Sequence, residues 1–113
     1  MKKDDYLVLI CRILAYLYEC VKNGETPDME YLHWETEQFP VCQKYWTYII
    51  RGLQSGGYID GVEIVKIAGS AKGIKVTPEL EITPEGILYL QQNSALEKAK
   101  EFLKTLKEIC PGI

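Results

Sequence analysis

Apolar residues recur at every third or fourth position near the start of the chain, over residues 5–22. This spacing predicts an α-helix with one apolar face. Val8, Leu9, Ile13 and Tyr16 widen that face well beyond a narrow stripe. We therefore expect this helix to lie at the centre of the fold or to be shared with a partner.

Two more helices and a hairpin are expected in the middle of the chain. The first helix covers residues 29–37 after a Thr-Pro-Asp start signal, and the second covers residues 41–55 and ends at Gly-Gly. β-Branched residues then favour a strand from residue 59, and residues 74–82 return as a second strand after a small, glycine-rich tip. Pro78 within that second strand indicates an edge or a bulge.

Two helices are expected after the hairpin. One starts at Thr83-Pro84 and closes at Asn93, and a capping box at Ser94 begins the other, over residues 94–110. The last helix packs on the domain's own core or, in the interpretation we favour, makes a homodimer. Its candidate dimerisation residues are Leu96, Ala99, Phe102, Leu103, Leu106 and Cys110.

The order of these elements predicts the fold. Three helices, a two-stranded wing hairpin and two C-terminal helices make an α+β winged helix (winged helix-turn-helix), here one domain over residues 1–113. In that fold the third helix packs across the first two, and the hairpin lies beside it. The competing fold is a helical bundle with a hairpin insert.

Four short segments resemble a known family. They are LQSGGYI at 53–59, ITPEGILYLQQNS at 82–94, AKEFLK at 99–104 and ICPGI at 109–113. Together they resemble the YjcQ-like family, which consists of small winged-helix proteins from low-GC Gram-positive bacteria and their phages. The resemblance spans nearly the whole chain and implies the winged-helix fold and a bacterial or phage setting. It implies no settled activity.

Charge is unevenly distributed along the chain. The 113 residues carry a net charge of −3, yet residues 41–78 hold five basic residues and only two acidic ones. Lys44, Thr47, Tyr48 and Arg51 also share one face of the expected third helix. In a winged helix that face enters the major groove, where Arg can read guanine, while wing lysines neutralise phosphates.

These positions predict a protein that binds double-stranded DNA, such as a transcriptional regulator of a bacterium or phage. The candidate DNA-binding residues are Gln43, Lys44, Thr47, Tyr48, Arg51, Gln54, Lys72 and Lys75. The alternative is a winged-helix module that binds or supports another protein. Tyr31 and Trp34, on the acidic second helix, would be its contact patch.

No pattern in the sequence indicates an enzyme. The carboxylates at positions 28, 30, 35 and 37 are interpreted as a solvated helix face, because acid–base catalysis needs carboxylates held in a cleft. His33 has no nucleophile at a recognisable spacing, and no phosphate-binding glycine loop is present. We expect no catalytic residue, no cofactor and no small-molecule ligand.

The cysteines favour a reducing compartment. Cys11, Cys20, Cys42 and Cys110 form no C-x-x-C pair, so zinc binding is not expected, and they are interpreted as reduced thiols. The N-terminus has no signal-peptide pattern, and the chain has no apolar stretch of membrane length. A cytoplasmic protein without membrane contact is therefore expected.

Overall fold

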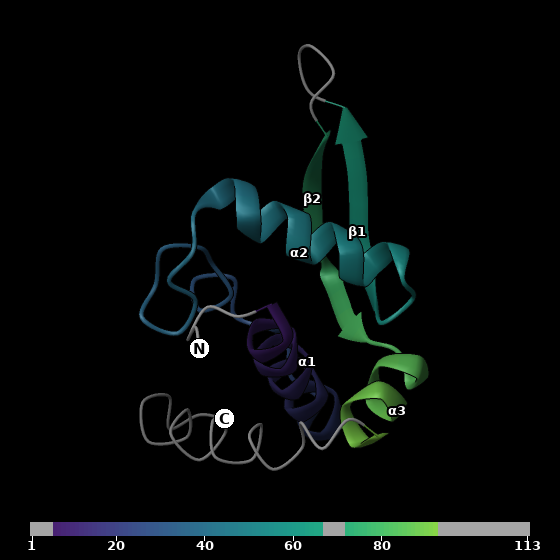
Figure 1. The fold of residues 1–113 in the computed structure, drawn as a ribbon. Coiled ribbons are helices and arrows are strands. Elements are labelled where there is room, and N and C mark those ends of the chain that lie inside the picture. The colour runs from purple at the N-terminus through teal and green to yellow at the C-terminus, as the bar shows by residue number, and fades with distance from the viewer. Residues whose placement is uncertain (1–5, 67–71, 93–113) are drawn as a thin grey trace.

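The computed structural model describes residues 6–66 and 72–92, which form three helices and a two-stranded antiparallel sheet, an α+β arrangement. The elements in chain order are α1 (Tyr6–Asn23), α2 (Gln43–Ser55), β1 (Ile59–Lys66), β2 (Lys72–Ile82) and α3 (Pro84–Gln92). In the view of Figure 1, α2 crosses in front of the hairpin, and α1 lies below α2. The predicted last helix, 94–110, with its candidate dimerisation residues, lies outside the described residues.

α1 forms the centre of the core. Most of its side chains from Leu9 to Cys20 are buried, and it contacts α2, α3 and β2. A helix that is apolar on nearly all sides is stable only when it is covered on those sides. The wide apolar face predicted for this helix is therefore largely covered by other elements of the same chain.

The helix predicted over residues 29–37 is wrong, because the chain there forms turns and bends. The carbonyl of Asp28 accepts the N–H groups of Tyr31 and Leu32, which makes a single turn. Glu35 then adopts φ 56°, a left-handed conformation that a continuing helix does not contain. Short helices are costly to nucleate, and within residues 29–37 only the adjacent Tyr31 and Leu32 are buried, which is too little for a helical apolar face.

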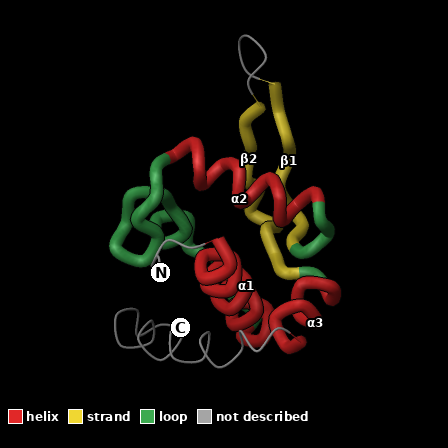
Figure 2. The backbone as a smooth tube through the Cα atoms, in the orientation of Figure 1, coloured by secondary structure: helices red, strands yellow, loops and turns green. Residues whose placement is uncertain are grey.

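A tight reversal replaces the end of that predicted helix, as the loop in Figure 2 shows. The N–H of Glu35 donates to the carbonyl of Val41, and the N–H of Thr36 donates to the carbonyl of Phe39. The Thr36 hydroxyl also accepts the N–H of Phe39. This reversal places the Phe39 ring fully inside the core. One aromatic anchor, rather than a helical stripe, holds the segment.

The hairpin contains the bulge that Pro78 indicated. The register of β1 and β2 shifts between Asp60 and Val62, and Pro78 lies in the part of β2 that the shift leaves without partners. Gly61, inside the shift, has φ 96°, and a Cβ there would lie 2.7 Å from the backbone of Leu80. Only glycine accepts both conditions, so the bulge is specified by sequence.

Thr83 joins α3 to the turn between α2 and β1. Its hydroxyl accepts the N–H of Gly86, as an N-cap does, and donates to the carbonyl of Gly57. Its own N–H donates to the carbonyl of Tyr58. The helix start predicted at Thr83-Pro84 is confirmed. Gly57 and Thr83 are 26 residues apart and belong to two of the segments that resemble a known family, 53–59 and 82–94. The two segments are thereby hydrogen-bonded to each other.

Tyr16 joins α1 to the loop that follows it. Its ring is buried, and its hydroxyl accepts the N–H of Asp28 at 2.9 Å. Burial raises the pKa of the Tyr16 hydroxyl above its ordinary value. The unfolded chain therefore ionises at lower pH than the folded protein does. The stability contributed by neutral Tyr16 is present below about pH 10 and is lost as the pH rises further.

Tyr16→Phe is expected to weaken this alkaline dependence. Urea titrations at about pH 8 and about pH 10.5 measure the free energy of unfolding on either side of the ordinary tyrosine pKa. The wild-type protein should lose more stability between the two than the variant does, because the variant cannot ionise at position 16. Equal losses would show that Tyr16 does not contribute to the dependence.

Candidate nucleic-acid interface

α2 has one apolar face and one basic face. The apolar face is buried and consists of Trp46, Ile49, Ile50 and Leu53. Lys44, Tyr48 and Arg51 lie on the opposite face, as their spacing predicts, with Lys44 and Tyr48 exposed and Arg51 half-buried. α2 contains no acidic residue. We call Lys44, Tyr48 and Arg51 the basic face of α2.

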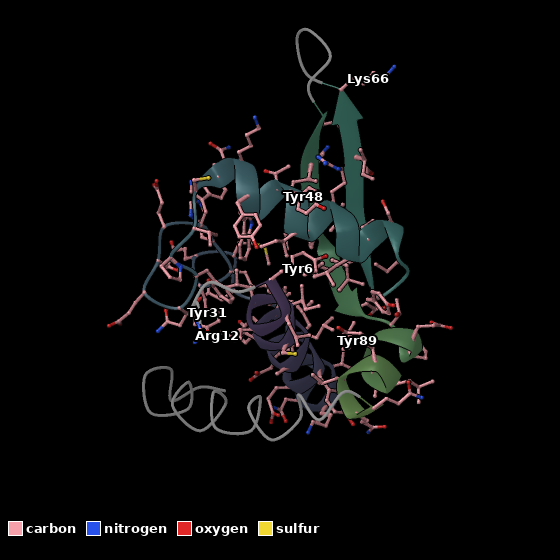
Figure 3. All side chains as sticks on the ribbon, in the orientation of Figure 1. Tyr6, Arg12, Tyr31, Tyr48, Lys66 and Tyr89 are labelled. Carbon is pink, nitrogen blue, oxygen red and sulfur yellow. The ribbon has the colours of Figure 1, made fainter. Side chains whose placement is uncertain are left out.

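Tyr48 is the centre of this basic face. Its side chain is 56% exposed, and the Arg51 guanidinium lies 5.7 Å from the centre of its ring. Tyr6, at the start of α1, contacts the same ring edge-on, with ring centres 6.3 Å apart (Figure 3). These contacts restrain two side chains, an arginine and a tyrosine, that can contact nucleic acid.

The chemistry of Tyr6 suits contact with an anion. Burial raises the pKa of its hydroxyl, and the neighbouring Tyr48 raises it further. Like any tyrosine, Tyr6 is neutral at physiological pH, so its hydroxyl can donate a hydrogen bond to a phosphate oxygen. The α1 terminus thus extends the basic face of α2 with a neutral donor.

Three further candidate residues lie on the borders of this face. Gln43, the first residue of α2, is exposed, and Thr47 is half-buried. Gln54 is half-buried, and its side-chain oxygen accepts the N–H of Val62 at 3.1 Å. That N–H follows Gly61, at the register shift between β1 and β2. Gln54 therefore ties the end of α2 to the base of the hairpin.

The hairpin carries the remaining candidate residues. Lys75 is exposed on β2 and is the register partner of Glu63. Lys72 is the first residue of β2 and is the register partner of Lys66. Lys66 is exposed and projects at the far end of β1, well beyond α2 (Figure 3). The structure thus distributes the candidate cations over α2 and the hairpin.

The carboxylates considered for acid–base catalysis lie in the loop after α1. Asp28, Glu30, Glu35 and Glu37 are all exposed there. The His33 ring stacks on Trp34 with centres 3.7 Å apart, and its Nδ1 lies 2.9 Å from the Trp34 carbonyl. These contacts account for the histidine as a structural residue of the loop.

Tyr31 does not lie on a helical surface patch with Trp34. Its ring is buried and packs on Tyr16 and Phe39, at centre distances of 4.8 and 5.7 Å. The sequence suggested a protein-binding patch around Tyr31 and Trp34. Tyr31 cannot belong to such a surface patch, because its ring lies in the core. The predicted acidic helix that would have presented it is a loop.

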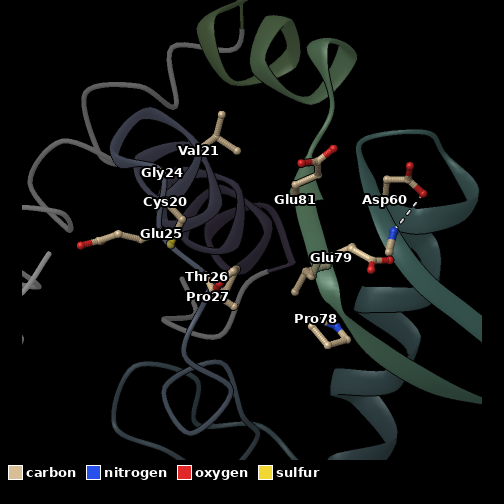
Figure 4. A pocket seen from close by; sticks show the side chains of 12 residues that line it. Cys20, Val21, Gly24, Glu25, Thr26, Pro27, Asp60, Pro78, Glu79 and Glu81 are labelled. Carbon is tan, nitrogen blue, oxygen red and sulfur yellow. Dashed lines mark hydrogen bonds between the residues drawn. The ribbon is translucent and has the colours of Figure 1, made fainter.

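An acidic hollow of about 440 Å³ opens between the end of α1 and the base of the hairpin (Figure 4). Glu25, Asp60, Glu79 and Glu81 line it. Their charges would repel a phosphate backbone, so the hollow is separate from the basic face of α2. Within residues 6–66 and 72–92, no group of three or more histidine, cysteine or acidic side chains is placed to hold a metal ion.

Sequence reasoning missed two members of this interface. Lys66 contributed to the basic segment but was not among the candidate residues, because only the strand register shows that it lies at the exposed end of β1. Tyr6 meets Tyr48 across two helices that are distant in sequence. A tyrosine near the start of the helix predicted over residues 5–22 was the signal available in the sequence.

Comparison with known proteins gives one match. A family model described as YjcQ protein matches residues 11–109. No curated protein and no solved structure matches the chain. Among the described helices, none is long and apolar enough to cross a bilayer.

Proposed function

This chain belongs to the YjcQ protein family, and from that premise we propose that it is a winged-helix protein that binds double-stranded DNA. α2 is the recognition helix, and the β1–β2 hairpin is the wing. Turns between residues 24 and 42 stand in place of the second helix of a winged helix. The Gln54–Val62 hydrogen bond fixes the wing against the end of α2.

The basic face of α2 is the observation that carries this proposal. Lys44 and Arg51 project from a helix without acidic residues, in a chain of net charge −3. A helix of this kind fits the major groove, which is about 12 Å wide. Gln43 and Arg51 supply donors for base edges, and Lys66 and Lys75 supply cations for phosphates. We extend the proposal to regulation of transcription in a bacterium or its phage, without a catalytic role.

Lys44→Ala with Arg51→Ala is expected to weaken duplex binding by about tenfold or more, whatever the sequence. Fluorescence anisotropy with a labelled duplex at about 50 mM salt measures the affinity, and a salt titration measures the slope, which should become shallower by about 0.9 per lost phosphate contact. Lys22→Ala is the matched control. Lys22 is an exposed cation near the other end of α1, paired with Glu19, and its loss should leave binding unchanged.

Two results would overturn the proposal. One is the absence of duplex binding by the wild-type protein at about 50 mM salt, where phosphate contacts are strong. The other is equal weakening by Lys22→Ala and by the double variant. Either result would favour the alternative, a winged-helix module that binds protein, which a pull-down from host lysate then tests. The homodimer expected from residues 94–110 stays a prediction.

A further inference from the structure

Tyr48 is an exposed aromatic side chain that its neighbours hold in place. Its exposed fraction of 56% is the largest among the bulky apolar and aromatic side chains that the structure describes. The Arg51 guanidinium lies 5.7 Å from the centre of the ring, and the Tyr6 ring meets the same ring edge-on. A ring restrained in this way loses less freedom when it contacts a ligand than a mobile side chain does.

The position of Tyr48 on α2 decides which part of a duplex it meets. Lys44 precedes it by one helical turn and Arg51 follows it by one, so Tyr48 lies in the middle of their common face. When such a face enters the major groove, its middle meets the edges of the bases, whereas the phosphates lie along the two walls. Tyr48 is therefore placed to contact bases.

The major groove offers one apolar group to an aromatic ring. The C5-methyl group of thymine lies there among hydrogen-bond donors and acceptors, and the other three bases carry no such group. The face of the Tyr48 ring is an apolar surface that can cover this methyl group. Removing one methyl group from water raises affinity about fourfold. The ring therefore favours thymine.

Arg51 places a donor for guanine beside that ring. Arginine pairs with O6 and N7 of guanine more often than any other side chain contacts a specific base. Base pairs stack about 3.4 Å apart, so two groups 5.7 Å apart reach the same base pair or adjacent ones. Thymine pairs with adenine, so thymine and guanine contacted in this way belong to adjacent base pairs.

We propose that Tyr48 and Arg51 together recognise a step of two base pairs in which thymine lies next to guanine. The Tyr48 ring covers the thymine methyl group, and the Arg51 guanidinium bonds to the guanine edge. This inference rests on the proposed function, because it requires α2 in the major groove of a duplex. It adds the identity of the bases that α2 distinguishes.

Base analogues in a selected duplex test both contacts. Selection from random duplexes of roughly two helical turns should enrich this step. Replacing its thymine with deoxyuridine removes only the methyl group and should weaken wild-type binding about fourfold. Replacing its guanine with 7-deazaguanine removes the N7 acceptor and should weaken binding about fivefold or more. Deoxyuridine at a thymine outside the enriched positions is the control and should change nothing.

Variants at position 48 assign the methyl contact to the tyrosine ring. Tyr48→Ala should bind the thymine and deoxyuridine duplexes equally, with the salt slope of the wild-type protein, because no phosphate contact is lost. Tyr48→Phe keeps the ring and should retain the fourfold difference. Leu88→Ala shortens another exposed side chain, 53% exposed on α3, and should also retain it. Circular dichroism checks the fold of each variant.

The outcomes separate this inference from the proposed function. If the wild-type protein binds no duplex, the proposed function fails and this inference fails with it. If the wild-type protein binds the thymine and deoxyuridine duplexes equally, only the recognition of the step fails. A difference that persists in Tyr48→Ala, or that disappears in Tyr48→Phe, would also overturn the inference, because the ring would not be the group that contacts the methyl.

Discussion

Gly86→Ala is expected to lower the free energy of unfolding by about 3 kcal/mol. A Cβ at position 86 would collide with the carbonyl oxygen of Tyr58 and would lie 2.7 Å from the Cγ1 of Ile82. The Tyr58 carbonyl already accepts the N–H of Thr83, so the backbone cannot withdraw without losing that bond. The clash lies at the contact between the α2–β1 turn and the start of α3.

Urea titration followed by circular dichroism measures this loss, and Gly52→Ala is the matched control. Gly52 also lies in a helix, but it is exposed, and the nearest atom to an added Cβ is the Tyr6 hydroxyl at 3.3 Å. Helix propensity should offset that contact by roughly 0.5 to 1 kcal/mol. Equal stability of Gly86→Ala and Gly52→Ala would show that the junction adapts to an added methyl group.

Phe39→Ala is expected to cost about 3 to 5 kcal/mol, which is comparable to the whole stability of many small domains. The Phe39 side chain is fully buried, with ring centres 5.7 Å from Tyr31 and 5.0 Å from Trp46. It is the anchor through which the loop reaches α2. Its removal leaves a cavity between the loop and α2.

Tryptophan fluorescence during urea titration measures this second loss, because Trp46 lies in the same cluster. Met29→Ala is the control, since Met29 belongs to the same loop and is 38% exposed, so its truncation should cost less than about 1 kcal/mol. Similar midpoints for the two variants would contradict the assignment of Phe39 as the anchor.

Most regular elements could be predicted because local sequence determines them. The apolar spacing in α1 and α2, the Gly-Gly stop at Gly56 and the Thr83 cap each act within a few residues. The turn after Asp28 could not be predicted in the same way. The reversal at residues 35–41 that follows it is held by the burial of Phe39 against residues distant in sequence. No local pattern encodes that contact.

The candidate interface was predicted in part for the same reason. Lys44, Tyr48 and Arg51 share a helix, so their common face follows from helical spacing alone. The contact of Tyr6 with Tyr48 and the bond of Gln54 to Val62 depend on how elements pack. The sequence predicts Gln54 as a base-contacting residue, whereas in the structure its side-chain oxygen accepts the backbone N–H of Val62.

The bond between Thr83 and Tyr58 also bears on how this family can diversify. Tyr58 precedes β1 and Thr83 follows β2, so this bond holds the two ends of the hairpin together. Residues 63–66 of β1 are exposed, and changes in loop length cost only slowly increasing entropy. Insertions and substitutions there can alter what the protein binds without rebuilding the domain. The same site is a natural position for a genetically inserted probe.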